Sequence, residues 1–183
     1  MNKEDNFKEK FKQALISTIK VISDEYRVET ELKKNLSSKN YNFFELDNLS
    51  SKQDYIKLRA ETDSEALKRK FSNKEIYKKN LPRNSSCRSL YNISERIRYE
   101  LLGTKMLKGI SKNLKENYNH KIAIKRKDQL KTREDVSISE AFELYMLKNF
   151  FDIKLNSLSE KILSFWENDF KTSFDKHINY FNK

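Results

Sequence analysis

Apolar residues recur every three or four positions along most of the chain, a spacing that places them on one face of a helix. The first such run predicts an amphipathic helix from about Asn6 to Ser23. Its inward-facing residues are expected to be Phe7, Phe11, Leu15, Ile19 and Ile22. A later run predicts a helix that begins with Asp63 as its N-cap and stops before the break at Pro82.

The longest helical pattern lies in the second half of the chain and opens with a capping residue at Asn84, Ser85 or Ser86. Its apolar stripe comprises Leu90, Ile93, Ile97, Leu101, Met106, Ile110 and Leu114. The chain's two glycines, Gly103 and Gly109, fall inside this pattern. We favour one long or slightly kinked helix in which Gly103 packs tightly against a neighbour, over a left-handed helix end at Gly103.

A polar, basic connection is predicted at about residues 115–136. Ser137 or Ser139 then opens another helix, and Ser137 and Glu140 have the spacing of a capping box. The last helix is predicted to start near residues 156–157. Its apolar face consists of Leu158, Ile162, Phe165, Trp166, Phe170 and Phe174.

Three segments near the N-terminus differ from the helical pattern. Residues 26–32 alternate between apolar and polar side chains, and residues 40–48 and 54–62 are short segments rich in aromatic or β-branched residues. Three strands are about the minimum for a sheet with one buried face. The expected fold is therefore α+β and predominantly α-helical: a helical bundle with a small three-stranded antiparallel sheet, in a single domain of residues 1–183.

The composition supports a folded chain with few obligatory breaks. Aromatic residues make up 12% of the 183 residues, more than disordered chains carry, and the chain has two glycines and one proline. The formal net charge of +11 is compatible with an anionic partner, but the lysines are spread along the chain. We interpret the densest basic cluster, Lys121–Arg133, as a solvated linker or helix face.

Few residues have the spacing that catalysis or metal binding requires. The chain has no glycine-rich phosphate loop, and its one cysteine, Cys87, excludes an intramolecular disulfide. His120 and His177 lack partners at metal-ligand spacing. The chain also lacks the apolar stretch of a signal peptide and any run long enough to span a membrane, so a soluble, cytoplasmic protein is expected.

Carboxylates gather at two places. The first cluster consists of Arg59, Glu61, Asp63 and Glu65. In the second, Arg98 follows Glu95 by three positions, so the two share a helix face and should pair, and Glu100 lies close by. Paired carboxylates can perform acid–base chemistry or hold a cation, but they are more often surface ion pairs worth about 0–1 kcal/mol.

The segment that contains both glycines resembles a family motif. Residues 95–114, "ERIRYELLGTKMLKGISKNL", are similar to the pattern E-x-x-R-x-E-x-L-G-x-x-x-x-x-G-hydrophobic-x-x-N-L in the N-terminal region of the CobT family. Members of that family are subunits of the aerobic, ATP-dependent cobaltochelatase. The matching positions are Glu95, Arg98, Glu100, Leu102, Gly103, Gly109, Ile110, Asn113 and Leu114.

A second segment, residues 57–82, is similar to a family segment that leads into a helix and then a proline. The matching positions are Arg59, Glu61, Asp63, Ala66, Leu67 and Pro82. The family often has His-Asp where this chain has Ser72 and Asn73. The family's von Willebrand A-like domain, which follows an acidic linker, has no counterpart here, so we expect a fragment, a truncated product or a stand-alone module.

The resemblance implies a non-catalytic adaptor or scaffold subunit that assists cobalt insertion into the corrin ring during cobalamin biosynthesis. The implied partners are an AAA+ ATPase subunit and a large chelatase subunit, in a hetero-oligomer without membrane or nucleic acid. Cobalt is then the substrate, and ATP and magnesium belong to the partner subunits. No catalytic residue, metal ligand or cofactor is expected in this chain.

Three alternatives remain open. The first alternative is a basic helical protein that binds nucleic acid or another polyanion through Lys121–Arg133. The second is a decayed remnant without chelatase function. The third alternative is an enzyme that uses a cation bound by carboxylates. Those carboxylates would be Glu61, Asp63, Glu95 and Glu100.

Overall fold

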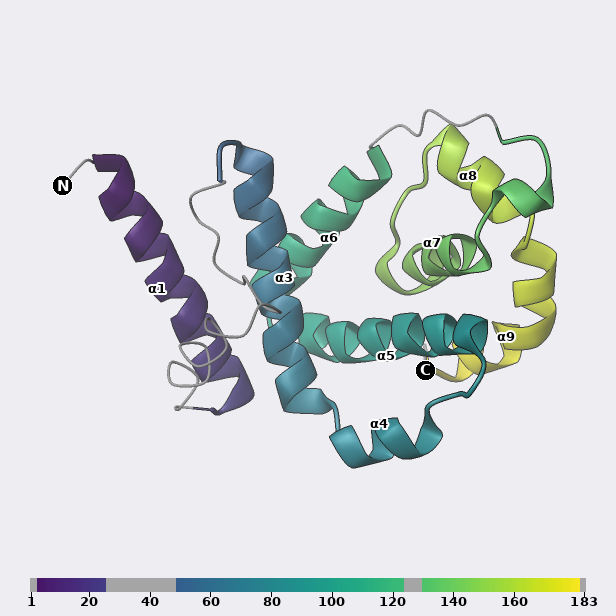
Figure 1. The fold of residues 1–183 in the computed structure, drawn as a ribbon, viewed down its shortest axis with the longest axis horizontal. Coiled ribbons are helices and arrows are strands. Elements are labelled where there is room, and N and C mark those ends of the chain that lie inside the picture. Colours follow the sequence, from purple (N-terminus) through teal and green to yellow (C-terminus); the bar gives the residue numbers. More distant parts are fainter. Residues whose placement is uncertain (1–2, 26–48, 124–129, 182–183) are drawn as a thin grey trace. The chain divides into compact units, whose positions relative to one another are not determined.

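The computed structural model describes residues 3–25, 49–123 and 130–181 and divides the chain into two compact units, Met1–Ser72 and Asn73–Lys183 (Figure 1). Every regular element within these ranges is a helix. The predicted three-stranded sheet is therefore wrong: residues 54–62 lie inside a helix, and residues 26–32 and 40–48 lie outside the described residues. The single-domain prediction for residues 1–183 stays a prediction.

The first unit contains α1 (Lys3–Ser23) packed on α3 (Lys52–Phe71). The prediction of α1 is confirmed, and Leu15, Ile19 and Ile22 are buried as expected. At one end of the pair, the Tyr55 ring of α3 meets the rings of Phe7 and Phe11 at centroid distances of 5.6 and 5.1 Å. Phe7 is still 57% exposed, so the apolar face of α1 is covered mainly along its second half.

The start of α3 explains why residues 54–62 form a helix. Ser51 is the N-cap: its Oγ accepts a hydrogen bond from the Asp54 amide, and Asp54 Oδ2 accepts one from the Ser51 amide at 2.8 Å. This capping box satisfies two amide groups that a helix start leaves without partners. The predicted helix start at Asp63 is consequently wrong, because Asp63 lies in the interior of α3.

The second unit contains the remaining elements (Figure 1). They are α4 (Lys74–Asn80), α5 (Ser85–Met106), α6 (Lys108–Ala123), the short 3-10 helix Arg133–Asp135, α7 (Ile138–Phe151), α8 (Ser157–Ser164) and α9 (Glu167–Phe181). The break predicted at Pro82 is confirmed between α4 and α5. The break between α3 and α4 at residues 72–73 was missed.

Helix α7 lies at the centre of this unit and packs on α5, α8 and α9. It is apolar on most of its circumference, the pattern of a helix with neighbours on several sides. The core around it consists of Leu130, Val136, Ala141, Phe142, Leu144, Tyr145, Ile162, Leu163 and Phe170. The ring of Phe170, from α9, lies 5.4 Å from the rings of both Phe142 and Tyr145.

Asparagine side chains cap two helices of this unit at starts that the sequence predicted. Asn84 caps α5 by accepting hydrogen bonds from the amides of Ser86 and Cys87, at 2.9 and 3.2 Å. Asn156 caps α8 through the Ser159 amide at 2.8 Å. Ser137 is the N-cap residue of α7 as predicted, but its side chain makes no capping hydrogen bond, so the expected capping box with Glu140 is absent.

The expected continuous helix through both glycines is wrong, and so is a left-handed end at Gly103. Leu107 adopts an extended conformation, with φ −134° and ψ 111°, and ends α5. Its carbonyl accepts the Ser111 amide at 3.2 Å, so α6 starts at once in a new direction (Figure 1). Glycine has low helix propensity, which weakens the helix around this point.

Two other boundaries also differ from the prediction. The supposed basic connection at 115–136 is helical up to Ala123, because Tyr118 continues the buried stripe of Ile110 and Leu114. The predicted last helix is divided into α8 and α9 at residues 165–166. In each case the apolar spacing indicated the buried face correctly and left the helix end undetermined.

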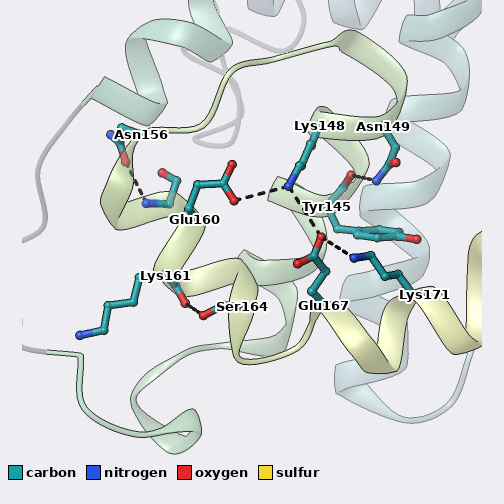
Figure 2. Close-up of polar contacts among 10 residues, drawn as sticks. Tyr145, Lys148, Asn149, Asn156, Glu160, Lys161, Ser164, Glu167 and Lys171 are labelled. Atoms are coloured by element: carbon teal, nitrogen blue, oxygen red, sulfur yellow. Dashed lines mark hydrogen bonds and ion pairs between the residues drawn. The ribbon is translucent and has the colours of Figure 1, made fainter.

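A polar network joins the last three helices at the surface (Figure 2). Lys148 Nζ of α7 lies 3.4 Å from Glu160 Oε2 of α8 and 3.7 Å from Glu167 Oε1 of α9. Lys171 approaches the same Glu167 oxygen at 3.2 Å. Exposed pairs of this kind contribute about 0–1 kcal/mol each, so the apolar core supplies most of the stability here.

Candidate functional site

The first carboxylate cluster of the sequence lies on α3, and its members do not converge. Arg59 Nε lies 3.4 Å from Asp63 Oδ1, one helical turn away, and Asp63 is fully buried. Glu61 is exposed and lies 3.9 Å from Lys57. A buried carboxylate needs a nearby cation or hydrogen-bond donors because losing its hydration is costly. Arg59 therefore supplies a compensating positive charge for the buried Asp63 carboxylate, and Glu61 lies at the surface.

The second cluster contains an ion pair that was predicted from spacing. Arg98 donates from Nε and Nη2 to the two carboxylate oxygens of Glu95, at 2.7 and 2.8 Å. Both residues are on α5, three positions apart. The hydrogen bond with Glu95 raises the pKa of Arg98, so the guanidinium stays charged. The two-point contact holds both side chains in one orientation, as parallel hydrogen bonds of this type do.

This ion pair lines an apolar groove with a volume of about 560 Å³. We call it the α5–α7 groove, because one wall comes from α5 and the other from α7, with Phe174 of α9 contributing. It is lined by Tyr91, Ser94, Glu95, Ile97, Arg98, Leu101, Leu102, Lys105, Phe142, Met146, Phe150 and Phe174. Seven of these side chains are aliphatic or phenylalanine, so the groove offers hydrophobic contacts with a few charges among them.

Glu100 does not line the α5–α7 groove and takes part in a buried contact. It is 1% exposed, and its Oε2 accepts a hydrogen bond from the Tyr118 hydroxyl of α6 at 2.5 Å. Burial raises the pKa of Tyr118, and the nearby Glu100 carboxylate raises it further. A hydroxyl that keeps its proton remains a donor to the carboxylate. Glu100 is consequently a structural link between α5 and α6, although the sequence placed it beside Arg98.

Two further charged residues of this region were missed by the sequence analysis. Arg96 Nη2 of α5 lies 2.9 Å from Glu143 Oε1 of α7. Burial lowers the pKa of Arg96, but the combined effects of Tyr118, Glu143 and Glu100 outweigh it and raise that pKa. The signal in the sequence was the four-residue spacing from Arg96 to Glu100, which places both on one helix face.

The remaining motif residues have separate surroundings. Gly103 is buried within α5, whereas Gly109 is exposed at the start of α6 and a Cβ added there would have no atom within 4 Å. Asn113 is half-buried on α6. The nine motif positions therefore have different roles, and Glu95, Arg98 and Leu102 are the ones that face the groove. An interaction role for Arg59, Glu61, Asp63 and the other motif residues stays a prediction.

Comparison with protein families supports the resemblance that the sequence motif indicated. The family model for cobalamin biosynthesis protein CobT matches residues 5–183. The chain belongs to the CobT family. No solved structure matches it. Membership in the CobT family confirms the resemblance drawn from residues 95–114 and implies a role in cobalamin biosynthesis.

The described part of this CobT-family chain contains neither a cluster of potential metal ligands nor a helix suited to a membrane. Within it, no three His, Cys, Asp or Glu side chains come together as a possible metal site. Among the helices of the described ranges, none has the length and apolar character needed to cross a bilayer. Cys87 is exposed in the first turn of α5, as expected for a residue on a helix face.

Proposed function

We propose that this chain is a non-catalytic adaptor or scaffold subunit of an ATP-dependent cobaltochelatase, assisting cobalt insertion into the corrin ring. The observation that carries the proposal is the CobT family match over residues 5–183. Cobalt is the substrate of the complex in this proposal. The AAA+ ATPase subunit handles ATP and magnesium, and the large chelatase subunit carries out the insertion.

The α5–α7 groove supports a role in assembly. It is largely apolar, and Leu102 on its wall is 38% exposed. Exposed apolar surface of this kind is costly to maintain in water and commonly marks a site of protein contact or ligand binding. The charged side chains on its wall include the Glu95–Arg98 pair of the family motif. Both the family and the surface therefore favour binding to partner subunits.

A reconstitution experiment tests the proposal. The full chain is mixed with the cognate ATPase and large chelatase subunits, and cobalt insertion is followed by the change in the corrin absorption spectrum. We expect insertion to require this chain, and the chain to elute with the ATPase in size-exclusion chromatography. Insertion at the same rate in its absence would refute the proposal.

Binding measurements with the same purified proteins distinguish the adaptor function from polyanion binding. Neutralisation of phosphates by Lys and Arg releases counterions, so nucleic-acid affinity falls steeply with salt. If the affinity of the chain for duplex DNA or RNA falls steeply with salt concentration and the chain fails to bind either chelatase subunit, the polyanion alternative is supported instead.

A further inference from the structure

The α5–α7 groove is elongated along α5. Its α5 wall extends from Tyr91 to Lys105, which corresponds to roughly 21 Å at a helical rise of about 1.5 Å per residue. The facing residues Phe142, Met146 and Phe150 of α7 are spaced by four, so they lie in a row along that helix. A channel of this length with apolar walls matches about four turns of an amphipathic helix, whose anchors recur every three or four residues.

The apolar surface continues beyond the end of the groove. Met106 follows Leu102 by four positions and lies on the same side of α5. Met106 is 53% exposed, and Leu107, where α5 ends, is 45% exposed. A small molecule held within the groove would leave these side chains in water. A partner helix lying along α5 would cover them, so the extended surface favours a macromolecular occupant.

The charges along the groove favour an acidic partner. The Glu95 carboxylate is balanced by Arg98, to which it is bound at two points. Lys105 lines the groove near the C-terminal end of α5, and it forms no ion pair with any residue in the described ranges. The local charge is therefore positive at that end, in a chain whose formal net charge is +11. An opposite charge on the partner improves association and sets its direction in the groove.

We propose that the α5–α7 groove binds an amphipathic helix of a partner subunit, whose apolar stripe contacts Leu101, Leu102 and Phe150 and whose acidic residue pairs with Lys105. This inference rests on the proposed function, because it takes the partner from the chelatase complex. It adds the binding surface, the chemistry of the partner segment and the end of the groove at which its carboxylate lies.

Charge substitutions in the full chain test the site. The groove variants are Leu102→Glu and Lys105→Glu, both at exposed positions where folding should be preserved. The matched controls are Val21→Glu, at an exposed apolar position on α1, and Lys112→Glu, at an exposed lysine on α6. Binding to the purified ATPase subunit and to the purified large subunit is measured separately by interferometry, and circular dichroism checks the fold.

We expect each groove variant to weaken binding to one of the two subunits at least tenfold, while the controls change it less than twofold. If the unaltered chain binds neither subunit, the proposed function fails and the groove proposal fails with it. If the unaltered chain binds and both groove variants bind equally well, the groove proposal fails alone and the adaptor function survives.

A photo-crosslink identifies the partner segment. With p-benzoylphenylalanine in place of Leu102, the crosslinked peptide should come from an amphipathic helix that contains Asp or Glu. Reversing that acidic residue to Lys should restore binding to the Lys105→Glu variant. A crosslinked segment without an acidic residue, or failure of the reversal to restore binding, overturns the proposal.

Sodium oleate tests the small-molecule alternative, because its apolar tail and carboxylate also suit the groove. We expect no saturable binding of oleate that depends on the groove. Saturable oleate binding that both groove variants abolish, together with unchanged subunit binding, would assign the groove to a small amphiphilic anion and overturn the docking proposal.

Discussion

Replacing Tyr118 by Phe should destabilise the second unit, because the hydroxyl is the hydrogen-bond donor to a buried carboxylate. Tyr118 is 3% exposed and Glu100 is 1% exposed, and their oxygens lie 2.5 Å apart. A hydrogen bond to a charged group contributes about 1.5–3 kcal/mol, and its removal leaves the buried acceptor without water to replace the donor. We therefore expect the Tyr118→Phe variant to lose about 1.5–3 kcal/mol of unfolding free energy.

The chain contains a convenient probe for this measurement. Its one tryptophan, Trp166, lies in the same compact unit as Tyr118, so tryptophan fluorescence during urea denaturation reports on that unit. Far-ultraviolet circular dichroism follows the helices of the whole chain in parallel. The free energy of unfolding in water is obtained by linear extrapolation for each variant.

Tyr91→Phe is the matched control. Tyr91 is a half-buried tyrosine on α5, and its hydroxyl makes no hydrogen bond with the residues in the described ranges. Its removal should change the unfolding free energy by less than about 0.5 kcal/mol. A loss that small in Tyr118→Phe, or an equal loss in Tyr91→Phe, would refute the assignment of Glu100 and Tyr118 as a stabilising pair.

Three further outcomes are expected. Because the pKa of Tyr118 is raised, the folded state keeps a proton that the unfolded state releases near pH ~10. The contribution of Tyr118 to the unfolding free energy is therefore complete below that pH and is lost above it. Urea denaturation between pH 8 and 11 should show a steeper fall in unfolding free energy for the unaltered chain than for Tyr118→Phe. Gly109→Ala should raise the unfolding free energy by roughly 0.4–1 kcal/mol in the same assay, because Gly109 has no positive φ and a methyl group there meets no atom within 4 Å. A lower unfolding free energy for this variant would contradict that reasoning. Arg133→Met should lower it by about 0.5–1 kcal/mol and alter Trp166 fluorescence, since the guanidinium carbon lies 3.6 Å from the indole centroid; an unchanged spectrum would count against the contact.

Local signals in the sequence predicted the starts of α1, α5, α7 and α8, and they missed the starts of α3, α4, α6 and α9. The candidate N-cap at Asn84 and the helix start near residues 156–157 were predictable because an N-cap interaction involves the next two or three residues only. Residues 54–62 were assigned to a strand from their aromatic and β-branched content. The capping box of Ser51 and Asp54, just before that segment, was the overlooked signal for a helix.

In the candidate site, too, only the contacts within one helix could be predicted from the sequence. The pairing of Glu95 with Arg98 followed from their spacing on one helix. The burial of Glu100 did not, because its partner Tyr118 is 18 positions away and reaches it only after the chain turns at Leu107. Nor did the groove, whose two walls belong to helices separated along the chain by α6 and the residues before α7.

By itself, the sequence determined the family, the helical periods of the chain and the ion pair at Glu95 and Arg98. These depend on residues a few positions apart, or on a motif read directly from the chain. Only the tertiary structure decided which charges are buried and where the apolar groove lies. Burial and concave surfaces arise when distant helices pack together, and the spacing of residues along one helix does not specify which neighbour covers it.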